Sequence, residues 1–310
     1  MALLFNSPRG DGEAWRAEFK RLVPDLEFRL WPDEAGNPVD IEYVLIQQPE
    51  PGQLGRYPNL KAIFSFGAGV DHYLTRPDRP PQVPIVRCVS EALNEGVTHY
   101  VVHWVLSLHR RFHRYHAHQA AGHWEKLPYG LARDRKVGIL GMGELGAASA
   151  RSLAALGFDV AGWSRRAKSV GGVASFHGDG GLMPFLARSE ILAIFLPVTS
   201  ATQGFLNTRT LNALPKGACL VNIARGPIIN DDDLLAALES GQVATAVLDN
   251  FHVEPLPAKH PYWTHPRVIV TPHAAGGVVP GSAAAVMADS IRAIRAGKRP
   301  RFLVDSTVGY

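Results

Sequence analysis

The sequence has few cysteines and no long apolar run. Its 310 residues include two cysteines, Cys88 and Cys219. Two are too few for a disulfide framework and are typical of reduced thiols in an intracellular, cytoplasmic protein. No stretch approaches the roughly 18 apolar residues that a membrane helix needs. The start, MALLFNSPRGDG, has an apolar run too short for a secretory signal. We therefore expect neither a disulfide-stapled secreted protein nor a membrane protein.

The sequence also lacks a strong excess of either charge. The chain has 32 Lys and Arg against 28 Asp and Glu, a formal net charge of +4, and neither sign forms a long run. That excess is too small to indicate nucleic acid as a partner, and it suits a phosphorylated ligand equally well. Internal repeats and low-complexity tracts are missing too. At roughly 150 residues per domain, the length indicates about two globular domains.

Short apolar runs alternate with longer amphipathic stretches along the chain. The runs that predict strands are 44–46, 62–66, 85–86, 137–140, 160–163, 191–195, 219–222, 244–248 and 268–270. Helices are predicted at 91–121, 145–155, 231–240 and 280–296, the third with Asn230 as its N-cap and Gly241 at its end. Apolar strands alternating with helices are typical of parallel sheets covered on both faces. The predicted fold class is α/β, with two Rossmann- or flavodoxin-like domains.

A glycine-rich turn follows the strand at 137–140. Its residues are Gly141, Met142, Gly143, Glu144, Leu145 and Gly146, and an alanine-rich helix comes next. This GxGxxG pattern between a strand and a helix is the fingerprint of dinucleotide binding. Gly141 permits the tight turn, Gly143 lets the backbone approach a pyrophosphate, and Gly146 lets the helix pack closely on the strand. The helix N-terminus attracts the phosphates.

The end of the next strand distinguishes the two nicotinamide coenzymes. An NAD site has an Asp or Glu about 20 residues after the glycines, on the ribose 2′-hydroxyl. Here the strand at 160–163 is followed by Ser164, Arg165 and Arg166, with Lys168 close behind. No carboxylate is present to repel a 2′-phosphate, the two guanidinium groups suit one, and Ser164 adds a hydroxyl donor. We predict NADP(H) as the preferred coenzyme, with NAD(H) as the alternative.

Three later segments each place a polar residue just beyond an apolar strand. Arg225 follows the strand at 219–222, Glu254 follows that at 244–248, and His273 follows that at 268–270. Ligands bind outside the carboxyl ends of strands in a doubly wound sheet, so these side chains should converge beside the nicotinamide. The set suits hydride transfer. Arg225 holds a carboxylate or polarises a carbonyl, His273 gives a proton to the developing alkoxide, and Glu254 orients the imidazole.

With these motifs the sequence resembles the D-isomer-specific 2-hydroxyacid dehydrogenase family over essentially its whole length, and within it the bacterial type A glyoxylate/hydroxypyruvate reductases. The motifs that carry the resemblance are VGILGMGELG, WSRR, FLPVTSATQGFLN, LVNIARG, LDNFHVEPLP, HPRVIVTPH and the terminal VDSTVGY. The resemblance implies that His273 is the acid/base, Glu254 its partner and Arg225 the substrate clamp. It also implies the reduction of a small 2-keto acid to the D-2-hydroxy acid.

The resemblance implies further binding residues and a domain layout. Along the coenzyme it places Leu196, Pro197, Val198, Ile223, Ala224 and Asp249, the last near the nicotinamide amide. It implies that the loop Ala68, Gly69 and Val70 presents backbone N–H groups to the substrate carboxylate, as small-residue loops after a strand tend to do. We expect a substrate domain of 1–97 plus 281–310 and a dinucleotide-binding domain of 98–280, with the active site in the cleft between them.

The chain departs from the family pattern at three places. Gln47 stands where an aromatic residue often lines the substrate pocket, His99 precedes Tyr100 where Glu is common, and Asn250 follows Asp249 where Val is common. The choice of keto acid therefore stays open. Two alternatives also stay open: an NAD-dependent dehydrogenase of other substrate range, and a nucleotide-sensing binding protein of the corepressor type.

Histidine is concentrated in one segment. Seven of the 13 histidines lie between positions 99 and 123, namely His99, His103, His109, His113, His116, His118 and His123. Pairs spaced four residues apart on a helix suit some metal sites. No cysteine or convincing carboxylate set accompanies them, so we interpret them as a solvated basic helix face and expect no metal. Relatives in the family usually pair through this region, which implies a homodimer.

Overall fold

The computed structural model describes residues 1–8, 10–305 and 308–309. Three residues of the C-terminal VDSTVGY motif, Ser306, Thr307 and Tyr310, lie outside the described residues. The chain forms two compact units. The first comprises Met1–Leu93 and Gly277–Tyr310, and the second comprises Asn94–Gly276. The sequence placed these changeovers a few residues later, after positions 97 and 280.

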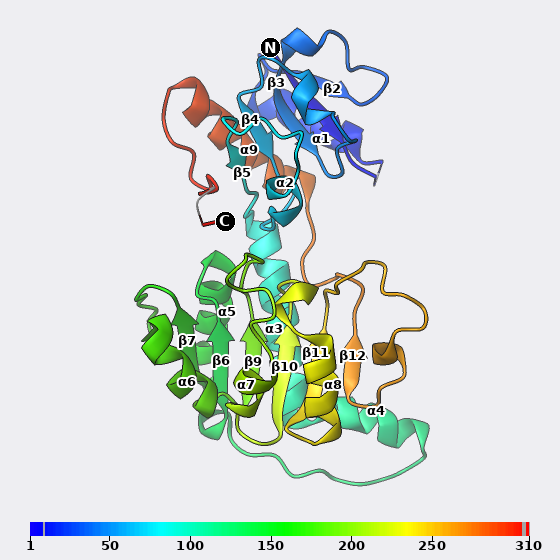
Figure 1. Ribbon diagram of the computed structural model, residues 1–310, viewed down its shortest axis with the longest axis vertical. Helices are drawn as coiled ribbons and strands as arrows, with labels where there is room; N and C mark the ends of the chain where they lie inside the picture. The colour runs from blue at the N-terminus through cyan, green and yellow to red at the C-terminus, as the bar shows by residue number, and fades with distance from the viewer. Residues whose placement is uncertain (9, 306–307, 310) are drawn as a thin grey trace. The chain divides into compact units, whose positions relative to one another are not determined.

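The first unit is built on a five-stranded parallel sheet within the described residues (Figure 1). The strands are β1 (Ala2–Asn6), β2 (Glu27–Leu30), β3 (Ile41–Ile46), β4 (Ala62–Phe64) and β5 (Ile85–Val86), in the order β2-β1-β3-β4-β5. The helices are α1 (Gly12–Leu22), α2 (Asp71–Leu74) and α9 (Pro280–Arg295), with short 3-10 turns η1 (Pro38–Asp40) and η2 (Leu54–Arg56). This is the flavodoxin-like strand order.

Alternation along the strands buries both faces of this sheet. On one face Leu4 of β1 packs with Val44 of β3. On the other, the ring of Phe5 meets that of Trp15 in α1, with centroids 5.5 Å apart. Helix α9 packs on α1, and the Arg292 guanidinium donates to the Leu22 carbonyl over 3.0 Å. The C-terminal helix therefore completes the first unit.

The second unit is built on a seven-stranded parallel sheet within its described residues. The strands are β6 (Lys136–Leu140), β7 (Asp159–Ser164), β8 (Ala174–His177), β9 (Ile191–Ile194), β10 (Ala218–Asn222), β11 (Val243–Leu248) and β12 (Val268–Val270). The helices are α3 (Glu91–Arg110), α4 (Phe112–Ala120), α5 (Glu144–Ala155), α6 (Gly178–Arg188), α7 (Thr208–Asn212) and α8 (Asp231–Glu239), with turns η3 (Ala132–Asp134), η4 (Gly226–Ile228) and η5 (Pro261–Trp263). The order is β12-β11-β10-β9-β6-β7-β8.

Both faces of the second sheet are covered, as the apolar strands predicted. Figure 1 shows α7 and α8 in front of the sheet and α3 behind it. Val137 and Ile139 of β6 pack towards α3 and α5, whereas Leu140 packs with residues of α6 and α8. From β6 the chain adds β7 and β8 on one side of the sheet, and it then returns to add β9 to β12 on the other side. The boundary between β6 and β9 is therefore the topological switch point, where open α/β sheets bind ligands.

The structure confirms the α/β class and corrects some elements. The single helix predicted over 91–121 is wrong, because Arg111 adopts a left-handed φ of 59° and separates α3 from α4. Strands β1, β2 and β8 were not predicted. Strand β8 is largely exposed, so its sequence lacks an apolar run. The cap of α8 is confirmed, since the Asn230 side chain accepts the Asp233 N–H over 3.1 Å.

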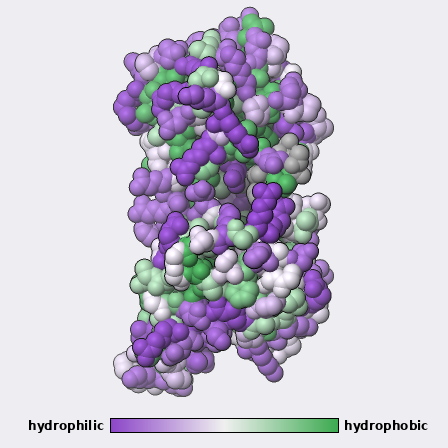
Figure 2. All heavy atoms as spheres, turned by 90° about the vertical axis from the view of Figure 1, so that its left-hand side faces the viewer, coloured by the Kyte–Doolittle hydropathy of each residue, from purple (hydrophilic) through white to green (hydrophobic). Residues whose placement is uncertain are grey.

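The surface is mixed in polarity. Hydrophilic residues cover most of the face that Figure 2 shows, with smaller hydrophobic patches between them. Within the described ranges, every helix is too short or too polar to cross a lipid bilayer. Both cysteines are free thiols, and Cys88 is buried.

Candidate active site

The glycine turn between β6 and α5 has the geometry that its sequence predicts. Gly141 has a φ of +111°, which favours glycine. A Cβ at this position would also lie 3.0 Å from the backbone of Phe195, directly after β9. The Gly141 N–H donates to the Trp163 carbonyl over 3.0 Å, so the turn is fixed between the ends of β7 and β9.

The other two glycines differ in the space around them. A Cβ on Gly146 would lie 2.0 Å from the Gly141 carbonyl oxygen, whereas a Cβ on Gly143 would meet no atom within 4 Å. Gly146 therefore brings helix and turn together, and the backbone at Gly143 faces open space. The first helical bond runs from the Ala147 N–H to the Gly143 carbonyl. The first N–H groups of an α-helix have no partner within the helix, and a helix N-terminus is therefore a favourable site for an anion.

Within the turn, the side chain of Met142 is buried. It lies against Gly162, where a Cβ would come within 2.2 Å of the methionine sulfur. Only the Met142 backbone is therefore placed to face a dinucleotide. Its carbonyl accepts a 2.8 Å hydrogen bond from the Lys168 ammonium, which joins the basic turn after β7 to the glycine turn.

The rest of the basic turn lies at the end of β7. Arg165 and Arg166 are both exposed at the end of β7, where a 2′-phosphate is expected. The Ser164 hydroxyl donates to the Arg166 carbonyl over 2.7 Å. This bond uses the one proton of the hydroxyl to shape the turn, and the role of Ser164 as a donor to a 2′-phosphate stays a prediction.

The segment after β9 borders the glycine turn. Leu196 is buried, while Pro197 and Val198 are half-buried. The Pro197 carbonyl accepts the Thr202 hydroxyl over 2.6 Å, which holds this loop. Of the three residues expected along the coenzyme, Pro197 and Val198 therefore keep exposed side-chain surface on this loop.

The loop after β10 carries Arg225 and is braced by a buried amide. The Asn222 side chain accepts the Ala224 N–H at 3.1 Å and donates to the Arg225 carbonyl at 3.2 Å. At the next residue, a Cβ on Gly226 would lie 2.1 Å from the Phe251 carbonyl carbon. Glycine at this position therefore allows the Arg225 loop to press against the segment after β11.

That segment carries Glu254, which pairs with His273. Glu254 Oε2 lies 2.7 Å from His273 Nδ1, and its other oxygen accepts the Phe251 N–H over 3.0 Å. Partial burial acts to raise the pKa of the Glu254 carboxyl. The hydrogen bonds from His273 and Phe251 and the charge of the imidazolium outweigh it and hold this pKa below its usual value. Glu254 is therefore an anion at neutral pH, and the Nε2 atom of His273 faces away from it.

A buried carboxylate holds the loop of His273. Asp249 is fully buried and accepts the N–H groups of Ala274 and Ala275 at 2.8 and 2.9 Å. It also accepts the Thr271 hydroxyl over 2.6 Å. The His273 N–H donates to the Asp249 carbonyl. These contacts support a positioning role for Asp249, and its place near the nicotinamide amide, which the resemblance implies, stays a prediction.

The loop is strained and is supported from α3 as well. His273 has a φ of 52°, a left-handed conformation that costs a non-glycine residue about 1–3 kcal/mol. The Tyr100 hydroxyl lies 2.6 Å from the Thr271 hydroxyl. Thr271 gives its own proton to Asp249, so Tyr100 donates, and burial raises the pKa of Tyr100 and keeps it protonated.

One residue that the sequence analysis did not assign links these loops. Asn250 is 2% exposed. Its amide is best satisfied with the nitrogen donating to the carbonyls of Ile223 and Ala224, at 3.1 and 3.2 Å. The oxygen then faces the His273 ring, 2.9 Å from Nδ1 and 3.1 Å from Nε2. Asn250 therefore ties the Arg225 loop to the imidazole. In the sequence, the sign of this role is that Asn250 stands where the family commonly has valine.

The loop Ala68–Val70 belongs to the first unit. The Ser65 hydroxyl donates to the Gly69 carbonyl over 2.9 Å and shapes the bend after β4. Val70 is buried and immediately precedes α2. Ala68 and Gly69 are half-buried, so part of the backbone that is expected to meet a substrate carboxylate faces solvent.

Comparison with known proteins identifies the family. Residues 102–275, more than half of the chain, match the family described as D-isomer specific 2-hydroxyacid dehydrogenase, NAD binding domain. The chain belongs to this family and is an NAD(P)-dependent oxidoreductase.

Solved structures agree over the full length of the chain. A D-isomer specific 2-hydroxyacid dehydrogenase from Xanthobacter autotrophicus, in complex with NADPH and MES, is 40% identical, with 100% of this chain and 99% of that one covered and a TM-score of 0.96. An NADPH-dependent glyoxylate/hydroxypyruvate reductase from Sinorhizobium meliloti, with NADP and sulfate, is 33% identical, with 100% and 99% covered and a TM-score of 0.92. A probable 2-hydroxyacid dehydrogenase from Rhizobium etli, with NADP, HEPES and L(+)-tartaric acid, is 32% identical, with 100% and 99% covered and a TM-score of 0.90.

The contrast between Gly143 and Gly146 gives a first prediction. Gly143→Ala adds a methyl group in open space, so its unfolding free energy should stay within about 0.5 kcal/mol of wild type. Its Kd for coenzyme should rise about tenfold or more, equivalent to roughly 1.4 kcal/mol, because the methyl group blocks the pyrophosphate. Gly146→Ala should lose about 1–3 kcal/mol of stability from the clash with Gly141.

Urea unfolding and the fluorescence of bound reduced coenzyme measure the two effects. Wild-type coenzyme affinity in Gly143→Ala would contradict the place of the pyrophosphate. Equal stability losses in both variants would contradict the difference in packing.

Proposed function

We propose that the protein uses NADPH to reduce a small 2-keto acid, of the glyoxylate and hydroxypyruvate type, to the D-2-hydroxy acid. The observation that carries this proposal is the convergence of three strand ends. Asn250 Nδ2 and Oδ1 reach the Ile223–Ala224 backbone and the His273 ring, and His273 pairs with Glu254 at 2.7 Å. An imidazole held by a carboxylate beside an arginine-bearing loop suits proton delivery to a carbonyl oxygen.

The second unit provides a place for the coenzyme. When bound, NADPH supplies a hydride to C2 of the keto acid. The backbone of residues 141–146 receives the pyrophosphate, because the glycine turn ends at the N-terminus of α5. Arg165 and Arg166 receive the 2′-phosphate, assisted by the nearby Lys168 charge. Three relatives of 32–40% identity hold NADPH or NADP, which supports NADP(H) over NAD(H).

His273 supplies the proton. Its Nδ1 is engaged by Glu254, so Nε2 is the atom that gives H⁺ to the carbonyl oxygen as C2 gains the hydride. The products are the hydroxy acid and oxidised coenzyme, and His273 regains its proton from water. Glu254 stabilises the imidazolium and fixes the ring, as its short hydrogen bond indicates. Arg225 carries a permanent positive charge that binds the substrate carboxylate or polarises the carbonyl.

The substrate class follows from this set of charges. An arginine in the site suits a carboxylate, and the loop Ala68–Val70 of the first unit is proposed to add backbone N–H donors. A relative named glyoxylate/hydroxypyruvate reductase and another with bound tartaric acid support a small, polar acid. Gln47, half-buried at the end of β3, offers an amide in place of an aromatic ring and favours a hydroxylated side chain over a phenyl one.

Removal of the imidazole tests the proton donor. His273→Ala should lower kcat by about 100- to 10,000-fold, the usual contribution of general acid catalysis, with NADPH affinity retained. The matched control is His252→Ala, a nearby half-exposed histidine whose ring contacts the Ile229 carbonyl, and it should keep near-normal kcat. Steady-state oxidation of NADPH with hydroxypyruvate measures both. Near-normal turnover in His273→Ala would contradict the assignment.

The basic turn after β7 tests the coenzyme. In the Arg165→Ser/Arg166→Ser double variant, the ratio of kcat/KM for NADPH to that for NADH should fall at least about 10- to 100-fold, because the loss of even one charge-assisted hydrogen bond costs roughly 1.5–3 kcal/mol. The NADH value itself should barely change. Arg151→Ser, at an exposed arginine of α5, is the control and should keep the wild-type ratio. An unchanged ratio in the double variant would contradict a 2′-phosphate site here.

We also propose that the protein is a homodimer that pairs through α3 and α4. A cavity of about 710 Å³ lies along these helices, with His103, Trp104, Phe112 and His116 in its lining. The chain after α4 exposes Trp124 completely, and Tyr129 and Leu131 by about half. One chain thus carries both an apolar cavity and exposed aromatic groups to fill it. Such a self-complementary surface is what a twofold interface requires.

A charge placed in the cavity lining tests the pairing. Phe112→Glu should convert a particle of twice the chain mass into one of 33.7 kDa, because an unpaired carboxylate is costly in an apolar interface. Met183→Glu, at an exposed position on α6, should remain dimeric. Sedimentation velocity at micromolar concentration measures the mass. A monomeric wild type would rule out the dimer, and a dimeric Phe112→Glu would place its interface elsewhere.

A further inference from the structure

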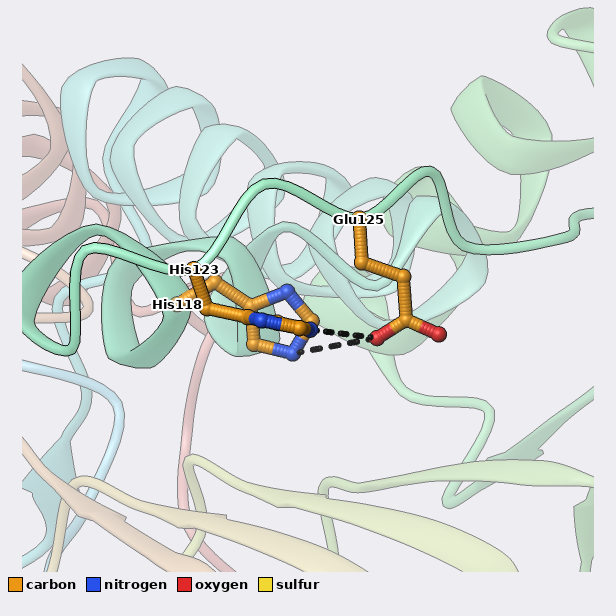
Figure 3. Close-up of side chains that lie close together, drawn as sticks. All are labelled: His118, His123 and Glu125. Carbon is orange, nitrogen blue, oxygen red and sulfur yellow. Dashed lines mark hydrogen bonds and ion pairs between the residues drawn. The ribbon is translucent and has the colours of Figure 1, made fainter.

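Three potential metal ligands gather where α4 ends. His123 Nε2 lies 3.2 Å and His118 Nε2 3.9 Å from the same carboxylate oxygen of Glu125. The three ligand atoms all lie within 4.8 Å of one another. Figure 3 shows both imidazole rings directed at that oxygen. The sequence alone offers these histidines no convincing carboxylate set, whereas the structure supplies a carboxylate from the chain beyond the helix.

The end of the helix itself brings the two histidines together. Gly122 has a left-handed φ of 61°. The His123 N–H donates to the His118 carbonyl over 2.8 Å, and the Gly122 N–H donates to the Gln119 carbonyl over 3.1 Å. This pair of bonds is the Schellman motif, which places the residue after the glycine beside the third-last residue of the helix. An apolar contact usually fills that place, whereas here two imidazoles meet with ring centroids 4.9 Å apart.

A second tether positions Glu125. The Leu127 N–H donates to the Tyr115 hydroxyl over 2.8 Å, and Leu127 is buried. The chain from His123 to Leu127 is therefore fastened to α4 at both ends. His118 is also confined, since its side chain is 16% exposed and its Nδ1 is buried. Its Nε2, on the side of Glu125, is the nitrogen open to a ligand.

We propose that His118, His123 and Glu125 bind a divalent transition metal ion, with Zn²⁺ as the best match. Two imidazole nitrogens and one carboxylate oxygen are a common zinc donor set that leaves a fourth position for water. Ligand atoms in a tetrahedral zinc site with bonds of roughly 2.0–2.1 Å are about 3.4 Å apart. The separations of 3.2 and 3.9 Å lie close to that value. An ion would balance the carboxylate charge while both imidazoles stay neutral.

The site lies apart from the glycine turn and the His273 loop in sequence and chemistry, so it does not depend on the proposed reaction. It does border the segment that is proposed to pair two chains. Its effect would be local. Trp124, fully exposed, stands between two of the three ligands, and a bound ion would fix the segment that carries it. The metal is thus proposed to order the chain that follows α4.

Metal titration of the full-length chain, freed of any affinity tag and treated with chelator, tests the site. Co²⁺ should bind at one equivalent per chain and give the visible absorption of four-coordinate cobalt, and Zn²⁺ should displace it. His118→Ala and His123→Ala should each weaken binding by about tenfold or more. The matched control is His99→Ala, which should bind like wild type. His99 faces Glu95 at 3.9 Å, and among the described residues this histidine–glutamate pair has no third potential ligand beside it.

Glu125→Gln keeps the shape of the side chain but removes its charge, so it tests the site even where a histidine variant is less stable. It should also weaken binding. Cu²⁺ should quench the tryptophan emission of wild type. It should not quench the emission of the other tryptophans, which is what remains in Trp124→Phe. Circular dichroism and NADPH binding confirm that each variant folds. No saturable Co²⁺ binding by wild type would overturn the proposal. So would undiminished binding in the His118→Ala/His123→Ala double variant, which would place the ion elsewhere.

Discussion

The carboxylate of Asp249, sealed from water at the end of β11, is the interaction on which the site depends. A buried anion is tolerated only when hydrogen bonds satisfy it. The donors here come from the loop after β12, at Thr271, Ala274 and Ala275. The same bonds hold His273 in a left-handed conformation that it would not adopt unaided. The hydrogen bonds that satisfy the Asp249 charge thus also fix the loop, and the fixed loop directs the His273 imidazole towards Glu254 and away from the core.

The surrounding parts extend this support. Asn250, the neighbour of Asp249, faces the imidazole and the backbone of the Arg225 loop, and Gly226 lets that loop approach within contact of Phe251. Loops after three parallel strands are therefore held by buried amides and by one position without a side chain. A glycine has a similar effect at the end of α4, where its positive φ brings His118 and His123 together.

Much of this arrangement could be predicted from the sequence because it is local. Apolar runs marked the strands of the second unit, glycine spacing marked the turn at Gly141, and polar residues after strands marked Arg225, Glu254 and His273. What escaped prediction depends on tertiary contacts. No hydrophobic pattern in the sequence marks the burial of Asp249, the internal hydrogen bond of Ser164 or the break at Arg111. Glu125 comes close to the two histidines only because the chain turns after α4. The exposed strand β8 lacks the apolar pattern altogether.

In the proposed reaction, a hydride passes from the coenzyme to the keto carbon while the protein supplies only a proton. The most direct measurement uses NADPH carrying deuterium at one face of C4, with hydroxypyruvate, followed by analysis of the glycerate formed. We expect one of the two labelled coenzymes to place deuterium on C2 of D-glycerate. Unlabelled NADPH in D₂O should leave C2 free of deuterium. Deuterium at C2 from the solvent, or an L product, would contradict it.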